Sequence, residues 1–333
     1  MPLARLKDFL EERQVACYLS AVAAAALLAW RVPASTQLAP AIEPLLGFML
    51  FVTFLQVPLT ELRRAAGNLR FLAALLAANF IAIPLLVAGL LPWLPGEPLA
   101  RAGMLLVLLT PCIDYVVTFA HLGRADARAL LAATPALLGA QMLLLPVYLG
   151  VFLDGQGAAL VQWEPFVRAF VWLIALPLAL AAACQAAAAR SRQADATVRL
   201  LGLLPVPATA LLLFVVVAAV APRLGLARDA VVAAVPVYAA YAVLAPAIGW
   251  GMGRLWRLPA GQARAISFSA ATRNSLVVLP LGLAIPGAVP VVPAVILAQT
   301  LVELLCELLY VWLLPRLGRT RPAARRIRHP PGA

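Results

Sequence analysis

The sequence is poor in charge and lacks the residue spacings that mark soluble enzymes. Only 12% of its 333 residues are charged, against about a quarter in soluble domains. It has no Gly-rich phosphate loop, so ATP-driven transport by this chain alone is not supported. Its two histidines, His121 and His329, form no metal-ligand pair, and its four cysteines form no CxxC pair. These absences argue against a zinc site or a disulfide framework, and we expect neither an enzyme nor a cofactor.

Long apolar runs are what the sequence does contain. Hydrophobic residues make up 64% of the chain, and the mean hydropathy is +0.96. A membrane helix needs roughly 20 predominantly apolar residues. The runs predict ten spans, near 15–30, 40–59, 71–92, 102–121, 129–152, 166–189, 200–221, 230–251, 263–286 and 290–314. We therefore predict an all-α integral membrane protein, with a single transmembrane transporter domain over residues 1–316 and a basic cytoplasmic tail over residues 317–333.

The net charge of +12 indicates membrane topology and not a nucleic-acid partner. Twenty of the 26 basic residues fall on the side of the predicted membrane that holds both termini. Five fall on the other side, and Arg273 lies within a span. Because cytoplasmic loops are enriched in Lys and Arg, the pattern predicts a multi-pass protein of the cell inner (plasma) membrane with both termini cytoplasmic. The expected partners are the lipid bilayer and a small substrate, and the sequence leaves open whether a homodimer forms.

The two halves of the chain share short sequence matches in the same order. Thr110-Pro111-Cys112 recurs 162 positions later as Thr272-Arg273-Asn274, and a second short match follows at a displacement of 158. Five-span halves insert with opposite orientations, so we predict two inverted repeats, about 15–152 and 166–314. Secondary transporters with such repeats place their site near the midplane, where discontinuous helices meet. Chance similarity between short matches is the plainer alternative.

Polar residues in the fourth span mark the first candidate site, because ionisable groups inside a membrane are costly. Pro111 removes a helix hydrogen bond and creates a new helix N-terminus beside Cys112, an environment that favours an anion or a thiolate. Four polar residues recur at helical spacing and are expected on one face: Thr110, Asp114, Thr118 and His121. We predict that Thr110, Cys112 and Asp114 bind substrate, and a simple packing kink is the alternative.

The ninth and tenth spans carry the second group of candidates. Arg273-Asn274-Ser275 lies at the repeat-equivalent position and is predicted to bind substrate. Glu303 and Glu307 share one face of the tenth span. We expect Glu303 to meet Asp114 and Arg273 in the core, and Glu307 to reach the interface. A structural ion pair between helices is the alternative, since intramembrane charges usually pair. Asn79 in the third span is interpreted as a helix-packing contact.

These features resemble the arsenite efflux permeases of the bile acid/sodium symporter superfamily. The resemblance covers roughly spans two to ten and depends on Pro111-Cys112, the Asn274-Ser275 break and Thr300-Leu301-Val302-Glu303. It implies a core domain and a panel domain, with spans four and nine broken and crossing near the midplane. It also implies that the Cys112 thiol binds the transported arsenic(III), a soft centre that favours a thiolate.

The chain departs from its apparent relatives at two places in the ninth span. Arsenite permeases usually carry a glutamate where this chain has Leu276-Val277, so Glu303 or Asp114 would have to carry a coupled proton. Bile acid symporters bind sodium through ninth-span residues whose nearest equivalents here are Ser269 and Arg273. A fixed guanidinium there should repel sodium, because like charges interact strongly in a low dielectric.

Three functions remain open at this point. The first is secondary efflux of trivalent arsenic by alternating access, with Cys112 at the substrate and a carboxylate carrying a proton. The second keeps the fold but transports an organic anion held by Arg273 and the helix breaks. The third is a membrane sensor without flux, which is disfavoured because no soluble output domain follows the last predicted span.

Overall fold

The protein, seen in a computed structural model, is helical over nearly all of its described residues, which are 2–56, 68–113, 115–153, 164, 167–168, 170–283 and 285–318. Six stretches among them are long and apolar enough to cross a membrane: Pro33–Phe54, Leu69–Trp93, Ala127–Phe152, Pro205–Arg223, Gly225–Leu255 and Val291–Arg316. Large apolar side chains stay exposed on the outside, including Leu143 (71%) and Val243 (72%), as expected of surfaces that face lipid. The chain is therefore an all-α, multi-pass membrane protein.

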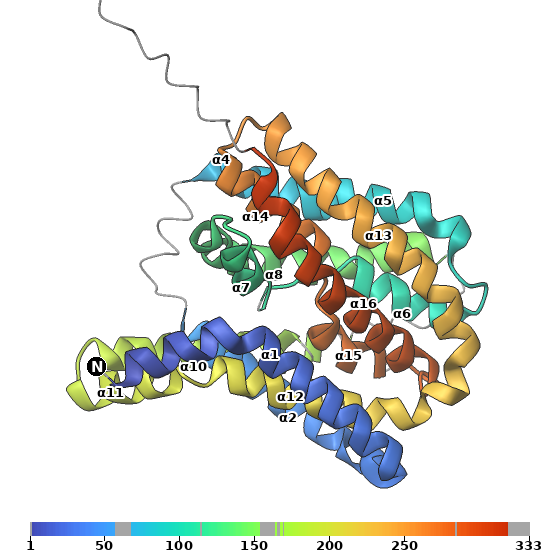
Figure 1. Ribbon diagram of the computed structural model, residues 1–333, viewed down its shortest axis with the longest axis horizontal. Coiled ribbons are helices and arrows are strands. Elements are labelled where there is room, and N and C mark those ends of the chain that lie inside the picture. Colours follow the sequence, from blue (N-terminus) through green and yellow to red (C-terminus); the bar gives the residue numbers. More distant parts are fainter. Residues whose placement is uncertain are drawn as a thin grey trace, which may run out of the picture.

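One layer of the molecule contains the N-terminal helices and the helices that begin the second half of the chain (Figure 1). Its elements are α1 (Pro2–Arg31), the 3-10 helix η1 (Pro33–Ala41), α2 (Ile42–Phe54), the π-helix η4 (Phe170–Ala175), α10 (Leu176–Ala188) and α12 (Pro205–Val220). α12 packs between α1 and α2, and α2 contacts α10. The Ser35 hydroxyl donates to the carbonyl of Ala218 at 2.7 Å, which joins η1 to α12.

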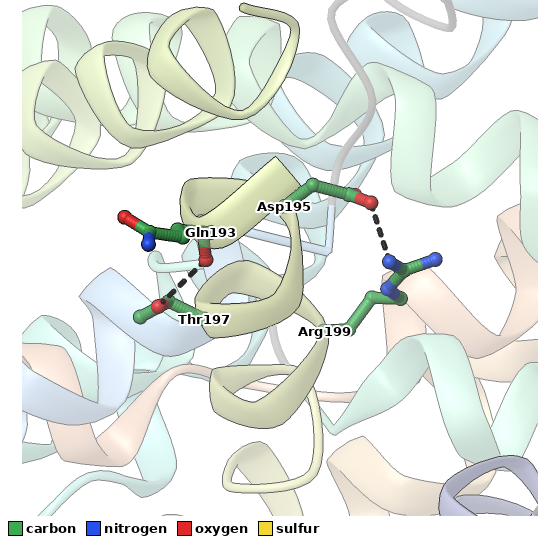
Figure 2. Close-up of polar contacts among 4 residues, drawn as sticks. All are labelled: Gln193, Asp195, Thr197 and Arg199. Carbon is green, nitrogen blue, oxygen red and sulfur yellow. Dashed lines mark hydrogen bonds and ion pairs between the residues drawn. The ribbon is translucent and has the colours of Figure 1, made fainter. Parts of the chain in front are cut away.

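A short surface helix, α11 (Arg192–Leu201), extends this layer beyond α10, and none of its residues is buried. Figure 2 shows its polar contacts: Arg199 pairs with Asp195 one turn away at 2.6 Å, and the Thr197 hydroxyl donates to the carbonyl of Gln193 at 3.1 Å. The paired side chains are 67% and 43% exposed. An exposed pair of this kind adds little stability.

The other layer holds the remaining helices (Figure 1). In chain order they are α4 (Leu69–Ala77), the π-helix η2 (Ala78–Ala82), α5 (Ile83–Leu90), η3 (Leu91–Trp93), α6 (Pro98–Leu108), α7 (Val116–Leu122), α8 (Ala127–Phe152), η5 (Ala221–Ala227), α13 (Arg228–Leu255), α14 (Ala260–Ala271), α15 (Ser275–Leu283), α16 (Val291–Leu313) and η6 (Leu314–Arg316). α16 packs against α6, α13 and α15, and contacts between α12 and α16 and between α2 and α15 join the layers.

Glycines let α13 approach α14 closely. A Cβ built on Gly249 would lie 2.7 Å from the Cα of Ser267, and one built on Gly253 would lie 2.6 Å from the Cα of Ala263. The spacing is that of the small-residue motif common at membrane helix interfaces. Gly251, between them, faces open space. The close contact fixes α14, whose C-terminal end forms part of the site described next.

Candidate functional site

Two helix breaks meet in the core of the second layer. α6 ends at Leu108 and α7 begins at Val116, while α14 ends at Ala271 and α15 begins at Ser275. Pro111 forms an antiparallel bridge with Arg273. Helix breaks inside a membrane leave backbone groups that must find partners within the protein. Here the backbone groups of each break find hydrogen-bond partners in the other break.

The hydrogen bonds between the breaks are reciprocal. The Cys112 N–H donates to the Thr272 carbonyl at 3.0 Å, and the Asn274 N–H donates to the Thr110 carbonyl at 2.8 Å. The hydroxyls of Thr110 and Thr272 each lie 2.7 Å from the carbonyl oxygen four residues earlier. Thr110 and Thr272, and likewise Cys112 and Asn274, are 162 positions apart. The same offset of 162 relates Pro111 to Arg273, which form the bridge, whereas the hydrogen-bonded pairs Cys112–Thr272 and Thr110–Asn274 are 160 and 164 positions apart.

The breaks contain most of the predicted substrate-binding residues. Thr110, Cys112, Arg273 and Asn274 are fully buried, and Ser275 is 1% exposed. Asp114, also predicted to bind substrate, lies outside the described residues.

Nε of Arg273 in the second break has no hydrogen-bond partner among the described residues, and neither have two side-chain atoms at the N-terminus of α15. They are Nδ2 of Asn274 and Oγ of Ser275. The other amide atom of Asn274, Oδ1, accepts from the Val277 N–H at 3.2 Å and so caps the start of α15. An unpaired buried polar atom costs about 1–3 kcal/mol. The two atoms are therefore available to a ligand at the N-terminus of α15.

Two expectations from the sequence were wrong. Thr110, Thr118 and His121 do not share one continuous helical face, because the helix stops at Leu108 and restarts at Val116. Glu307 does not reach the interface, since it is fully buried and its Oε1 lies 2.5 Å from the Thr272 hydroxyl. The first error came from extending an ideal helix through the break, and the second from placing Glu307 by its distance from the centre of the tenth span.

Glu303 ties the two breaks to α16. Its carboxylate accepts from the Tyr115 hydroxyl, from the backbone N–H of Arg273 and from Nε2 of Gln299, each at 2.6 Å. An ionised carboxylate is an acceptor only, whereas a protonated one must also donate. The Arg273 N–H and Gln299 Nε2 can only donate, and the Tyr115 hydroxyl lies closer to Glu303 than to its other acceptor, the Arg273 carbonyl at 3.3 Å. These contacts fit the ionised form of Glu303.

Glu307, one turn further along α16, fits the opposite state. The Thr272 hydroxyl lies near both Glu307 Oε1 and the Phe268 carbonyl, but a hydroxyl carries a single hydrogen. If that hydrogen goes to Phe268, which can only accept, then Glu307 must donate and is protonated. Like charges one helical turn apart also repel. We interpret the pair as an ionised Glu303 and a protonated Glu307.

The guanidinium of Arg273 contacts neutral oxygens. Its Nη2 donates to Asn79 Oδ1 at 2.9 Å, to the Ala270 carbonyl at 2.8 Å and to the Ser269 carbonyl. Its Cζ lies 5.7 Å from the ring centre of Tyr241. Arg273 and Glu303 do meet, but through the backbone N–H of Arg273. Asn79 is thus more than a packing contact, and Tyr241 was not singled out from the sequence because no local pattern distinguishes it.

The comparison with known families bears on this site directly. The model of the sodium bile acid symporter family matches residues 43–227, just over half of the chain. The chain belongs to the sodium bile acid symporter family. Members of this family are transporters, so the superfamily and the transporter class expected from the sequence are confirmed. The matched range includes Pro111 and Cys112, whereas the second break and α16 lie beyond it. No curated protein matches the chain.

Proposed function

We propose that the protein is a secondary efflux transporter for trivalent arsenic, which binds the Cys112 thiolate where the breaks cross. The supporting observation is the combination of a buried thiol with two buried, unpartnered polar groups, Asn274 Nδ2 and Ser275 Oγ, on the break bonded to it. Arsenous acid has a soft, thiophilic centre and hydroxyl groups that need hydrogen-bond partners. The Cys112 thiol would form an S–As bond by displacing one hydroxyl, which leaves as water with the thiol proton, and the Asn274 amide and Ser275 hydroxyl would bind the two hydroxyls that remain on the arsenic.

Transport would proceed by alternating access of the second layer, as core, against the first layer, as panel. Helices occupy parts of all ten predicted spans, and the reciprocal bonds between the breaks support two inverted repeats. We propose that both termini face the cytoplasm and that the protein lies in the inner (plasma) membrane. The burial of Cys112 and Asn274 means that this conformation is occluded, so substrate entry requires the core to move.

Proton coupling would act through Glu303. This carboxylate accepts from Tyr115, beside the first break, and from the Arg273 N–H in the second. A protonated Glu303 is a weaker acceptor, so the arrival of a proton would loosen both breaks at once. A small cavity lined by Glu303, Gln299, Tyr241 and Tyr310 lies next to it. Asp114 remains the alternative carrier.

The test is arsenite accumulation in cells that lack their own arsenite efflux system. Cells with the wild-type protein should accumulate less arsenite than cells with an empty vector, and cells with Cys112→Ser should match the empty vector. Cys184→Ser is the matched control, because Cys184 lies in α10 of the other layer, and it should protect like wild type. Equal protection by Cys112→Ser at equal expression would rule out the thiol mechanism.

The second candidate is an organic anion transporter, which family membership favours. In its simplest form an anion would pair with Arg273, but that guanidinium is fully buried and already bonded to protein oxygens. The anion would instead bind at the N-terminus of α15, beside Asn274 and Ser275. Uptake of a radiolabelled bile acid into proteoliposomes, unchanged by Cys112→Ser, would favour this candidate over arsenic efflux.

A further inference from the structure

We propose that the guanidinium of Arg273 is a built-in cation that occupies a cation site, so that this protein needs no sodium, and that removing the guanidinium opens the site to free sodium. The inference deepens the proposed function and depends on it only for the claim about coupling. The cation site itself is tested below by a measurement that involves no transport.

The oxygens around the guanidinium form a cage of the kind that binds a hard cation. Nη2 alone has three oxygen neighbours, Asn79 Oδ1 and the carbonyls of Ser269 and Ala270, and Nη1 lies 3.5 Å from the carbonyl of Leu108. Carbonyl and amide oxygens are usual protein ligands of hard cations. Some cation sites consist of such oxygens alone, with no carboxylate. A small cation in the place of Nη2 would therefore be surrounded by the same three oxygens without any rearrangement of the protein.

The position is also electrically suited to one positive charge. Leu108 is the last residue of α6, and Ser269 and Ala270 lie in the last turn of α14. Each helix C-terminus carries roughly half a negative elementary charge, so the two ends together call for about one cation. In other secondary transporters the C-terminal ends of such half-helices coordinate the coupling ion. Here the positive charge comes from the chain itself, because Arg273 lies in the break that directly follows α14.

The surroundings hold the guanidinium in place. Asn79 sits in the π-helix η2 and also donates to Leu75 and to Ser269 Oγ, which fixes Oδ1 toward Arg273. The Tyr241 hydroxyl donates to the Ala270 carbonyl at 2.8 Å. Because these partners are themselves fixed by other contacts, the cage should persist when the arginine side chain is removed. It would then be a set of buried oxygens without a partner, which favours uptake of a small cation.

The experiment compares thermal unfolding of the purified full-length protein in sodium chloride and in N-methyl-D-glucamine chloride at equal ionic strength. Wild type should melt at the same temperature in both. Arg273→Ala should melt lower than wild type in the sodium-free buffer and gain about 4 °C in 150 mM sodium, for a millimolar dissociation constant. Arg273→Lys keeps a tethered cation with three donors and should be insensitive to sodium, like wild type.

Each outcome decides the proposal. A sodium-dependent rise in melting temperature that is seen for Arg273→Ala and for neither of the other two proteins supports it. Recovery of folded Arg273→Ala from sodium buffer but not from sodium-free buffer supports it too. Sodium stabilisation of wild type overturns it, as does an Arg273→Ala variant that ignores sodium or is recovered from neither buffer. Because arsenite accumulation is measured separately, a failed arsenic assay with a positive sodium shift would overturn the substrate and leave the cation site standing.

Discussion

The assignment of charge to Glu303 and Glu307 can be tested by neutralising each in turn. The two residues lie one turn apart on α16, are 3% and 0% exposed, and differ in the number of donors that face them. Glu303→Gln and Glu307→Gln are therefore matched substitutions in one environment. If Glu303 is ionised and Glu307 is protonated, the first exchange removes a charge and the second removes none.

The expected magnitudes follow from the hydrogen bonds. Glu303 Oε2 accepts from Arg273 N and Gln299 Nε2, and Oε1 accepts from the Tyr115 hydroxyl. A glutamine can keep its oxygen toward the first two donors, while the tyrosine reverses its role and accepts. Three bonds then lose their charge assistance, at about 1 kcal/mol each, for a total of about 3 kcal/mol. Glu307→Gln keeps a neutral donor toward Thr272 and should change stability by less than about 1 kcal/mol.

Thermal unfolding in detergent, followed by tryptophan fluorescence, measures both variants. For a chain of this length about 3 kcal/mol corresponds to a fall in Tm of about 4 °C, which is expected for Glu303→Gln only. Gln299→Ala, which removes one donor from Glu303, should fall between that variant and wild type. Equal Tm values for the two glutamine variants, or a larger fall for Glu307→Gln, would refute the assignment.

Two further predictions concern stability away from the site. Gly253→Ala should lower Tm, because its Cβ would lie 2.6 Å from the Cα of Ala263 and overpacking costs about 1–3 kcal/mol; Gly251→Ala, which meets open space, should leave Tm unchanged or slightly raised, and the reverse order would contradict the close packing of α13 on α14. Asp195→Ala should change the free energy of unfolding by no more than about 0.5 kcal/mol, because its pair with Arg199 is largely exposed; a larger loss would show that α11 packs more tightly against its neighbours.

The sequence predicts those features of the site that depend only on residues that are neighbours in the chain. Pro111 cannot continue a helix hydrogen-bond ladder, so a break at that position follows from its residue type. The second break was expected from its repeat-equivalent position and from the resemblance to arsenite permeases, because polar residues by themselves do not end a helix. The burial of Glu303 followed from its place in the middle of a long apolar span.

Contacts between segments that are distant in the chain could not be predicted from the sequence, and the error at Glu307 is of this kind. Glu307 was placed at the interface by its distance from the centre of an ideal span, but the fold brings the end of α14 beside it, and Thr272 meets its carboxyl group. Arg273 was expected to meet Glu303 in the core, and it does so through its backbone N–H. The sequence did not reveal that its guanidinium would contact Asn79 and helix-end carbonyls, because segments far apart in the chain bring those oxygens together.

The sequence by itself determined that the protein lies in a lipid bilayer, its helical class, the position of the first break and the short list of candidate site residues. These follow from apolar run length, from proline and from the cost of polar groups in lipid. Only the tertiary structure decided that the two breaks satisfy each other's backbone groups, that Glu303 joins them, and that the guanidinium lies in an oxygen cage. Those contacts join residues 30 to about 190 positions apart, and no local pattern encodes which distant oxygens will converge.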